Sequence, residues 1–122
     1  MRTASYDRTT IIATAFIRDA SARMHGQTRE AIDCLASASW LGVRQNLTSL
    51  RGEAERVARV ECHLSHRAAS HRLRTQVKAA LTALDAAAMR PLGDALAQIL
   101  QLTRGARRHS RAAVARTTKR GH

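Results

Sequence analysis

Apolar residues recur at helical spacing from near the start of the chain to about residue 39. At 100° per residue they share one face, and the phase of that face continues through Gly26. The face is formed by Ile12, Ala13, Phe16, Ile17, Ala20, Met24, Ala31, Leu35 and Ala38. One glycine inside a helix costs only about 1 kcal/mol relative to alanine. The pattern therefore predicts a long amphipathic helix over about 9–39, with Thr9 or Thr10 as its N-cap.

A second apolar stripe begins just after Trp40, Leu41 and Gly42. Glycine is common where a helix ends or the chain turns, so we place a hairpin turn at Trp40 and Gly42. The stripe predicts a second helix over about 43–69, and its members are Leu47, Leu50, Ala54, Val57, Leu64 and Ala68. Two amphipathic helices joined by a short connection are expected to pack as an antiparallel hairpin.

The apolar phase changes near Ser70. The residues that follow share a face rotated by about 150° from the preceding stripe. Either a helix ends near Ser70, or one long helix presents a second face to a different neighbour; we place a boundary there. Leu73, Val77, Leu81, Leu84 and Ala88 form the new face, and Pro91 separates it from a last apolar segment. Helices are thus expected over about 71–89 and 92–104.

Together these segments predict an all-α fold. An antiparallel helical hairpin is extended to a small bundle of three to five helices, in a single helical domain over 1–103. β-Branched and aromatic residues are scarce while alanine and leucine are abundant, which argues against a sheet. We recognise no internal repeat.

Charge is distributed unevenly along the 122 residues. Lys and Arg number 21 against 9 acidic residues, which gives a formal net charge of +12. Residues 104–122 hold seven Arg and Lys residues and no acid, together with Gly, Ser, Thr and Ala. Such a composition cannot build a core, so we expect a disordered basic tail over 104–122 that attracts polyanions.

A row of basic residues runs through the middle of the chain in steps of three or four. It consists of Arg56, Arg59, His63, Arg67, His71, Arg74 and Lys78. On one continuous helix this row suits a phosphate backbone or an acidic partner helix, although a solvated face is the simpler alternative. The predicted nucleic-acid contacts are Arg56, Arg59, Arg67, Arg74, Lys78, Arg104, Arg107, Arg108, Arg111, Arg116, Lys119 and Arg120.

The sequence holds no convincing metal or catalytic motif. Cys62 and His66 are neighbours on a helix, but a structural zinc site needs four ligands, which Cys34 and His25 would have to complete. There is no Gly-rich phosphate loop, no Gly-x-Ser-x-Gly and no paired carboxylates in a plausible cleft. We therefore predict a non-enzymatic protein with no metal, no cofactor and no small-molecule substrate.

Two cysteines and the absence of a long apolar run bear on location. If the hairpin turns at residues 40–42, the sulfurs of Cys34 and Cys62 lie about 20 Å apart; a turn at 46–49 would bring them level. We favour the first turn, which predicts free thiols and a cytoplasmic location. No run of 18 apolar residues occurs, so no membrane span is expected.

The order helix, Trp40-Leu41-Gly42, helix resembles the Trp-x-Gly family of small type VII secretion substrates. The resemblance covers about residues 9–88. It implies two long antiparallel helices with the motif in the connecting turn, a dimer and no enzymatic activity. Two features depart from the family: this chain is strongly basic, and the export signal Tyr-x-x-x-Asp/Glu is missing, since the only tyrosine is Tyr6.

Two functional hypotheses follow from these observations. The first is a small basic helical protein that binds DNA or RNA mainly through phosphate contacts, with affinity supplied by residues 104–122. The alternative is a helical-hairpin interaction module that dimerises or binds a partner helix, as a secretion substrate, chaperone or adaptor. The expected partners are nucleic acid or an acidic protein, together with a second copy or a helical partner.

Overall fold

Amphipathic helices make up the described part of the protein in a computed structural model. The structure describes residues 2–60 and 64–120, with side chains over 15–60 and 67–104. Within these residues there are four helices and no strand: α1 (Arg2–Ala36), α2 (Trp40–Ala58), α3 (Leu64–Asp85) and α4 (Met89–Arg120). The prediction of an all-α helical bundle is confirmed.

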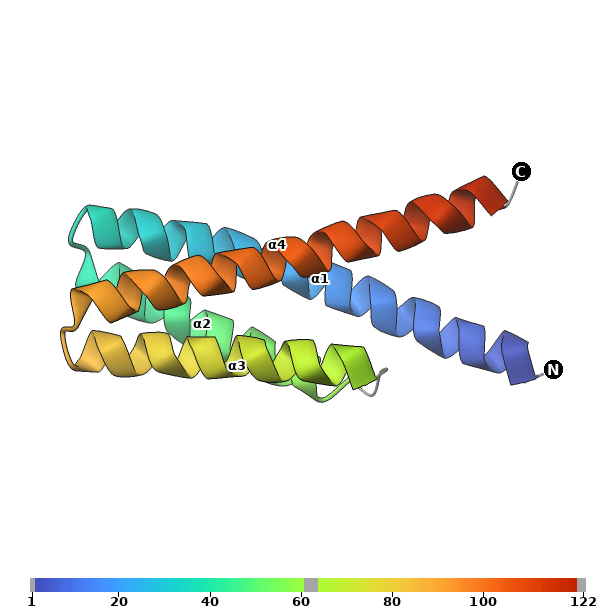
Figure 1. The fold of residues 1–122 in the computed structure, drawn as a ribbon, viewed down its shortest axis with the longest axis horizontal. Helices are drawn as coiled ribbons and strands as arrows, with labels where there is room; N and C mark the ends of the chain where they lie inside the picture. Colours follow the sequence, from blue (N-terminus) through green and yellow to red (C-terminus); the bar gives the residue numbers. More distant parts are fainter. Residues whose placement is uncertain (1, 61–63, 121–122) are drawn as a thin grey trace.

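The helices pack in a ring, each against two others. α1 and α3 both contact α2 and α4, so the apolar stripes face a common centre. The α1–α2 and α3–α4 connections lie together at one end of the bundle, which we call the loop end (Figure 1). At the other end α1 and α4 continue past α2 and α3 and diverge (Figure 1). We call residues 104–120 of α4 the C-terminal extension.

Two turns of three residues, 37–39 and 86–88, reverse the chain at the loop end. The middle residue of each is an alanine with a left-handed backbone, φ 58° at Ala38 and φ 54° at Ala87. This conformation ends a helix by satisfying its last carbonyl groups through the amides that follow. An L-residue adopts it at a cost, so alanine at both positions shows that packing of the helices enforces the turn.

The backbone hydrogen bonds of the two turns are nearly identical. In the first turn the amides of Ser37, Ala38, Ser39 and Val43 donate to the carbonyl oxygens of Asp33, Leu35, Cys34 and Ser39, respectively. The distances are 3.1, 3.1, 2.8 and 3.0 Å in the same order. In the second turn the amides of Ala86, Ala87, Ala88 and Leu92 donate to the carbonyl oxygens of Thr82, Leu84, Ala83 and Ala88, respectively. These distances are 3.0, 3.1, 2.8 and 3.0 Å in the same order. The bundle therefore contains a structural repeat of two hairpins. Sequence analysis missed this repeat because the hairpins have few identical residues, although they share an apolar pattern.

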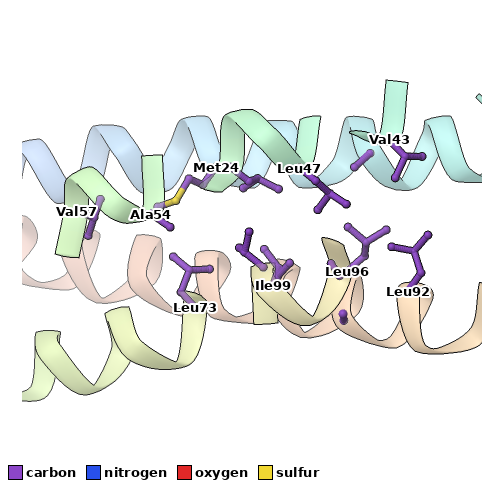
Figure 2. Close-up of a cluster of buried hydrophobic side chains, with 14 of the residues drawn as sticks. Met24, Val43, Leu47, Ala54, Val57, Leu73, Leu92, Leu96 and Ile99 are labelled. Atoms are coloured by element: carbon purple, nitrogen blue, oxygen red, sulfur yellow. The ribbon is translucent and has the colours of Figure 1, made fainter. Parts of the chain in front are cut away.

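The core runs along the centre of the bundle from Ile17 to Thr103. Leu47, Leu96 and Ile99 are fully buried there, and Figure 2 shows side chains from all four helices meeting. Its buried apolar members are Ile17, Ala20, Met24, Ala31, Val43, Leu47, Leu50, Ala54, Val57, Leu73, Val77, Ala80, Ala83, Leu92, Ala95, Leu96 and Ile99. Burying one leucine-sized side chain contributes about 2 kcal/mol, so this core holds the four helices together.

Buried polar contacts mark the end of the core from which α1 and α4 continue. The Thr103 hydroxyl donates to the Ile99 carbonyl oxygen at 3.0 Å, and its oxygen lies 3.2 Å from Nδ1 of His25. This bond ties α1 to α4 close to the C-terminal extension.

The predicted helix boundaries need several corrections. α1 begins at Arg2 and passes through Thr9 and Thr10, so neither threonine is its N-cap. α1 ends at Ala36, so Trp40 and Gly42 lie in the first turn of α2 and not in the connection. α2 ends at Ala58 instead of about residue 69, and α3 passes through Ser70 without a break. No glycine or proline marks the true boundary at 59–60, and the apolar spacing of the second stripe continues across it.

The predicted helix over 92–104 is also longer in the structure. α4 begins at Met89 and continues as one helix to Arg120, whereas the sequence predicted disorder over 104–122. Pro91 is the third residue of α4, where the amide has no partner within a helix and proline is tolerated. Alanine and arginine, both strong helix formers, make up much of the C-terminal extension, and Gly105 does not end the helix.

Gly42 is required by packing and not by a turn. A Cβ at this position would lie 2.6 Å from Sγ of Cys34 and 3.2 Å from its Cβ. α1 and α2 therefore approach each other closely beside the first turn, which is the usual reason for glycine within a helix interface.

Candidate nucleic-acid interface

Two adjoining hollows follow the junction between α2 and α3. The larger has a volume of about 570 Å³ and extends from Arg51 to Asp85. The smaller, about 370 Å³, lies at the end of the bundle opposite the turns and includes Arg59 and Arg67. Both are lined by His71 and Arg74, so they form one continuous depression. We call it the basic groove, after its members Arg51, Arg59, Arg67, His71, Arg74 and Lys78.

Most positive charge in the basic groove has no acidic partner. Arg51, Arg59, Arg67 and Lys78 are exposed and make no ion pair within the part of the chain that the structure describes. Arg74 is the exception, with Nε at 3.1 Å from Oε1 of Glu55. Exposed cations without carboxylates remain available to an external anion.

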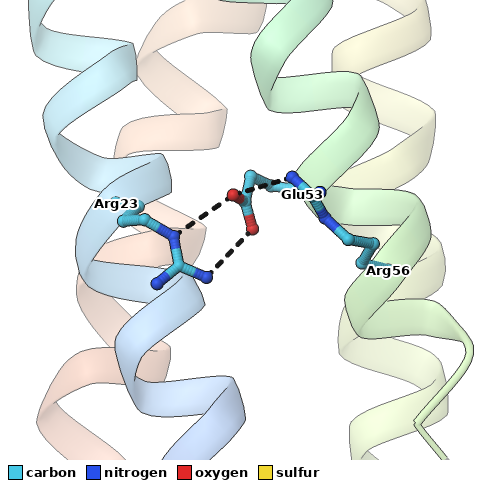
Figure 3. A network of polar contacts seen from close by, with 3 residues as sticks. All are labelled: Arg23, Glu53 and Arg56. Atoms are coloured by element: carbon cyan, nitrogen blue, oxygen red, sulfur yellow. Dashed lines mark hydrogen bonds and ion pairs between the residues drawn. The ribbon is translucent and has the colours of Figure 1, made fainter.

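A second set of arginines is neutralised inside the protein. Glu53 is 7% exposed and lies between α1 and α2, where it accepts from two guanidinium groups (Figure 3). Nε and Nη2 of Arg23 lie 3.2 and 3.3 Å from its two oxygens, and Nη2 of Arg56 lies 2.9 Å from Oε1. The hydrogen bond and charge of Glu53 raise the pKa of Arg23. We call these three residues the Glu53 cluster.

The predicted basic row is divided by the structure. Arg67, His71, Arg74 and Lys78 lie on α3 and line the basic groove. Arg59 joins them from the turn after α2, although the row is not one continuous helix. Arg56 is separated from them, because it pairs with Glu53. His63 lies outside the described residues.

Sequence analysis missed Arg51 as a member of the groove. It lies eight residues before Arg59, and positions eight apart lie near one face of a helix. That spacing is the signal that could have identified it. The predicted row begins at Arg56, whose side chain belongs to the Glu53 cluster, and therefore does not include Arg51.

The remaining predicted contacts lie on the C-terminal extension of α4. Arg104 is exposed. Those whose side chains lie outside the described set are Arg107, Arg108, Arg111, Arg116, Lys119 and Arg120. The extension leaves the bundle at the end where the smaller hollow lies (Figure 1). The two basic regions are therefore at the same end of the bundle.

Other chemistry has little support in the described residues. Among them no three His, Cys, Asp or Glu side chains are close enough together to hold a metal ion. Cys34 is a free thiol, half-buried against Gly42, whereas Cys62 is outside the described range. None of the described helices combines the length and apolar character that crossing a membrane requires.

Comparison with known proteins does not assign this chain to a family. No protein-family model, no curated protein and no solved structure matches this chain. The resemblance to the Trp-x-Gly family therefore stays a prediction, and functional inference rests on the geometry and charge described above.

Proposed function

We propose that this protein binds nucleic acid through the phosphate backbone, using the basic groove and the C-terminal extension. The observation that carries the proposal is the set of four exposed, unpaired cations along one groove: Arg51, Arg59, Arg67 and Lys78. Outside the groove Arg23, Arg44 and Arg56 are held by carboxylates. Other exposed arginines that make no ion pair among the described residues, such as Arg29 and Arg90, do not line the groove.

The length of the groove suits a nucleic-acid strand. Arg67 and Lys78 are eleven residues apart on α3, a rise of about 16 Å. Along a duplex axis that distance spans about five phosphates of one strand. A linear row of arginines matches such a repeating anion better than it matches one compact anionic group.

The C-terminal extension supplies further positive charge at the end of the bundle where the smaller hollow of the groove lies (Figure 1). Residues 104–120 carry seven Arg and Lys residues without an acid. Neutralising seven phosphates would give a slope of about −6 for the logarithm of affinity against that of salt concentration. The extension therefore supplies affinity, while the groove on the folded bundle orients the strand. Phosphate contacts alone carry little base specificity, so we expect weak sequence preference.

The alternative function, a helical interaction module, has a different basis. Apolar stripes left incomplete within one chain would favour it, but here the stripes of four helices cover one another. Three exposed apolar residues at the loop end, Trp40, Leu41 and Met89, are the observation that still favours an interaction role. An enzymatic role has no supporting cluster among the described side chains.

The proposal is tested by fluorescence anisotropy of labelled duplex DNA and RNA over a salt series. The full chain is compared with a 1–103 truncation, which retains Thr103, the last buried residue among the described side chains. We expect a log–log salt slope of about −4 or steeper for the full chain and loss of most of that slope on truncation. Failure of the full chain to bind either duplex at low salt would contradict the proposal. Equal affinity for polyglutamate would favour an acidic protein instead.

A charge-matched pair of variants then locates the site. Arg67→Gln with Lys78→Gln removes two groove cations, and should make the slope shallower by about 2 and weaken binding about tenfold. Arg29→Gln with Arg90→Gln removes the same charge from exposed positions outside the groove and should change affinity less than about twofold. Equal weakening by both pairs would mean that net charge, and not the groove, determines binding.

A further inference from the structure

We propose that the loop end is a self-association surface, at which two copies of this chain meet end to end. Four large apolar residues with described side chains are exposed, and three of them, Trp40, Leu41 and Met89, belong to the loop end. Leu41 is 68% exposed. Isolated exposed apolar side chains are ordinary, but a cluster with a hollow beside it is typical of an interface.

The hollow lies between the two hairpins. It has a volume of about 460 Å³ and a largely apolar lining formed by Trp40, Leu41, Leu84, Ala87, Met89 and Leu92. Arg44, also part of the lining, is paired with Asp85, with Nη2 and Oδ1 2.6 Å apart, so its charge is compensated. The surface thus combines protruding apolar residues with an apolar recess.

The loop end offers apolar residues from both hairpins, and a symmetric contact needs such a patch to be complementary to itself. Trp40 and Met89 are each the first residue of the second helix of a hairpin, so they occupy equivalent positions. In a two-fold contact each copy offers the same patch, and Leu41, which lines the hollow of its own chain but is largely exposed, can enter the hollow of the other copy while the reverse contact forms. The recess and the residue that fills it are both present on one chain.

Charge favours a second copy over a polyanionic partner at this surface. Residues 33–44 and 82–94, which surround the turns, hold two arginines and three aspartates, in contrast to the +12 of the whole chain. An acidic partner would be attracted to the basic groove, and nothing steers it to the loop end. The loop end is also where two strongly basic chains meet with least repulsion.

The end-to-end arrangement keeps the C-terminal extensions far apart. α2 has 19 residues and spans about 28 Å, so the basic ends of two copies would be separated by more than about 50 Å. The Debye length at physiological salt is about 8 Å, so repulsion between these ends is screened. Because the patch is small, we expect a weak dimer of the kind that transient interfaces form. Its dissociation constant should be on the order of tens of micromolar.

The experiment is sedimentation equilibrium of the full chain at about 0.15 M salt, up to about 200 µM protein. We expect a monomer–dimer equilibrium that Leu41→Glu weakens at least tenfold, since it would place a carboxylate in the apolar recess of each partner. Phe16→Gln is the matched control, because Phe16 is exposed and apolar but lies on α1 away from the loop end. Circular dichroism verifies that both variants are folded.

Three results would overturn the inference. They are a wild-type chain that stays monomeric over this range, a dimer that Leu41→Glu leaves intact, and a dimer that Phe16→Gln weakens equally. Small-angle scattering adds a test of geometry: an elongated dimer of about twice the monomer's bundle length supports it, and a compact side-by-side dimer contradicts it.

The dimer has a consequence that rests on the proposed function. With basic ends at opposite poles, it would join two separate duplexes. Leu41→Glu should then retain binding of one duplex but lose capture of a fluorescent duplex by a second, bead-bound duplex. Loss of capture with intact single-duplex binding supports the dimer, whereas loss of both would implicate the nucleic-acid site instead.

Discussion

The Glu53 cluster and the basic groove lie on opposite sides of α2 and use arginine differently. In the cluster a buried carboxylate between α1 and α2 holds Arg23 and Arg56, both about half-exposed. In the groove between α2 and α3, Arg51 and Arg59 have no such partner in the described residues, and Glu55 holds only Arg74. One helix thus presents compensated charge to one neighbour and uncompensated charge toward another.

This difference shows that a count of basic residues overstates what is free to bind. Glu53 neutralises one guanidinium by a two-point contact and shares an oxygen with a second, and a carboxylate in such a network contributes more than an isolated surface pair. The Glu53 cluster joins α1 to α2. The exposed cations of the groove other than Arg74 make no ion pair among the described residues that would stabilise the fold.

Breaking the cluster should have the largest effect on stability. Glu53→Ala removes hydrogen bonds to two guanidinium groups from a buried position, so we expect a loss of about 1–2 kcal/mol in the free energy of unfolding. Urea denaturation monitored by circular dichroism measures it. Affinity for duplex DNA should not fall, because the change adds net positive charge without altering the groove.

Glu30→Ala is the control for that prediction. Glu30 is exposed on α1 and makes no ion pair among the described residues, so the free energy of unfolding should change by less than about 0.5 kcal/mol. If the two alanine variants are equally stable, the Glu53 cluster does not hold α1 to α2.

Releasing the one paired cation of the groove sharpens the comparison, with a smaller effect. Glu55→Gln removes the partner of Arg74 and one negative charge from the groove lining. Binding of duplex DNA should tighten about threefold, with a slope steeper by about 1. Stability should change by less than about 0.5 kcal/mol, because the pair is exposed. Weaker binding of this variant in the anisotropy assay would contradict an anion-binding groove.

The sequence predicts much of the fold because apolar spacing determines which faces become buried. The first turn lies within three residues of its predicted position, since one apolar stripe ends at Ala38 and the members of the next begin at Leu47. The boundary after Ala58 could not be predicted in the same way. It carries no helix-breaking residue, and Leu64 continues the preceding spacing by coincidence.

The candidate site was predictable only where it lies on one helix. The spacing of Arg67, Arg74 and Lys78 places them on one face of α3 from sequence alone. The local spacing of Glu53 and Arg56, three residues apart on α2, was the signal that could have removed Arg56 from the set, whereas the contact of Arg23 with Glu53, thirty residues away, has no such signal. Tertiary contacts of this kind decide which charges are compensated, and no local pattern encodes them.

The central claim is that the uncompensated side of α2 and α3 contacts phosphate and that the Glu53 side does not. The most direct test is a backbone amide NMR titration of the full chain with a short DNA duplex. We predict shifts concentrated at Arg51, Arg59, Arg67 and Lys78 and along the C-terminal extension, with little change at Arg23. Shifts centred on Arg23 and the Glu53 cluster, or no shifts in the groove, would contradict the account.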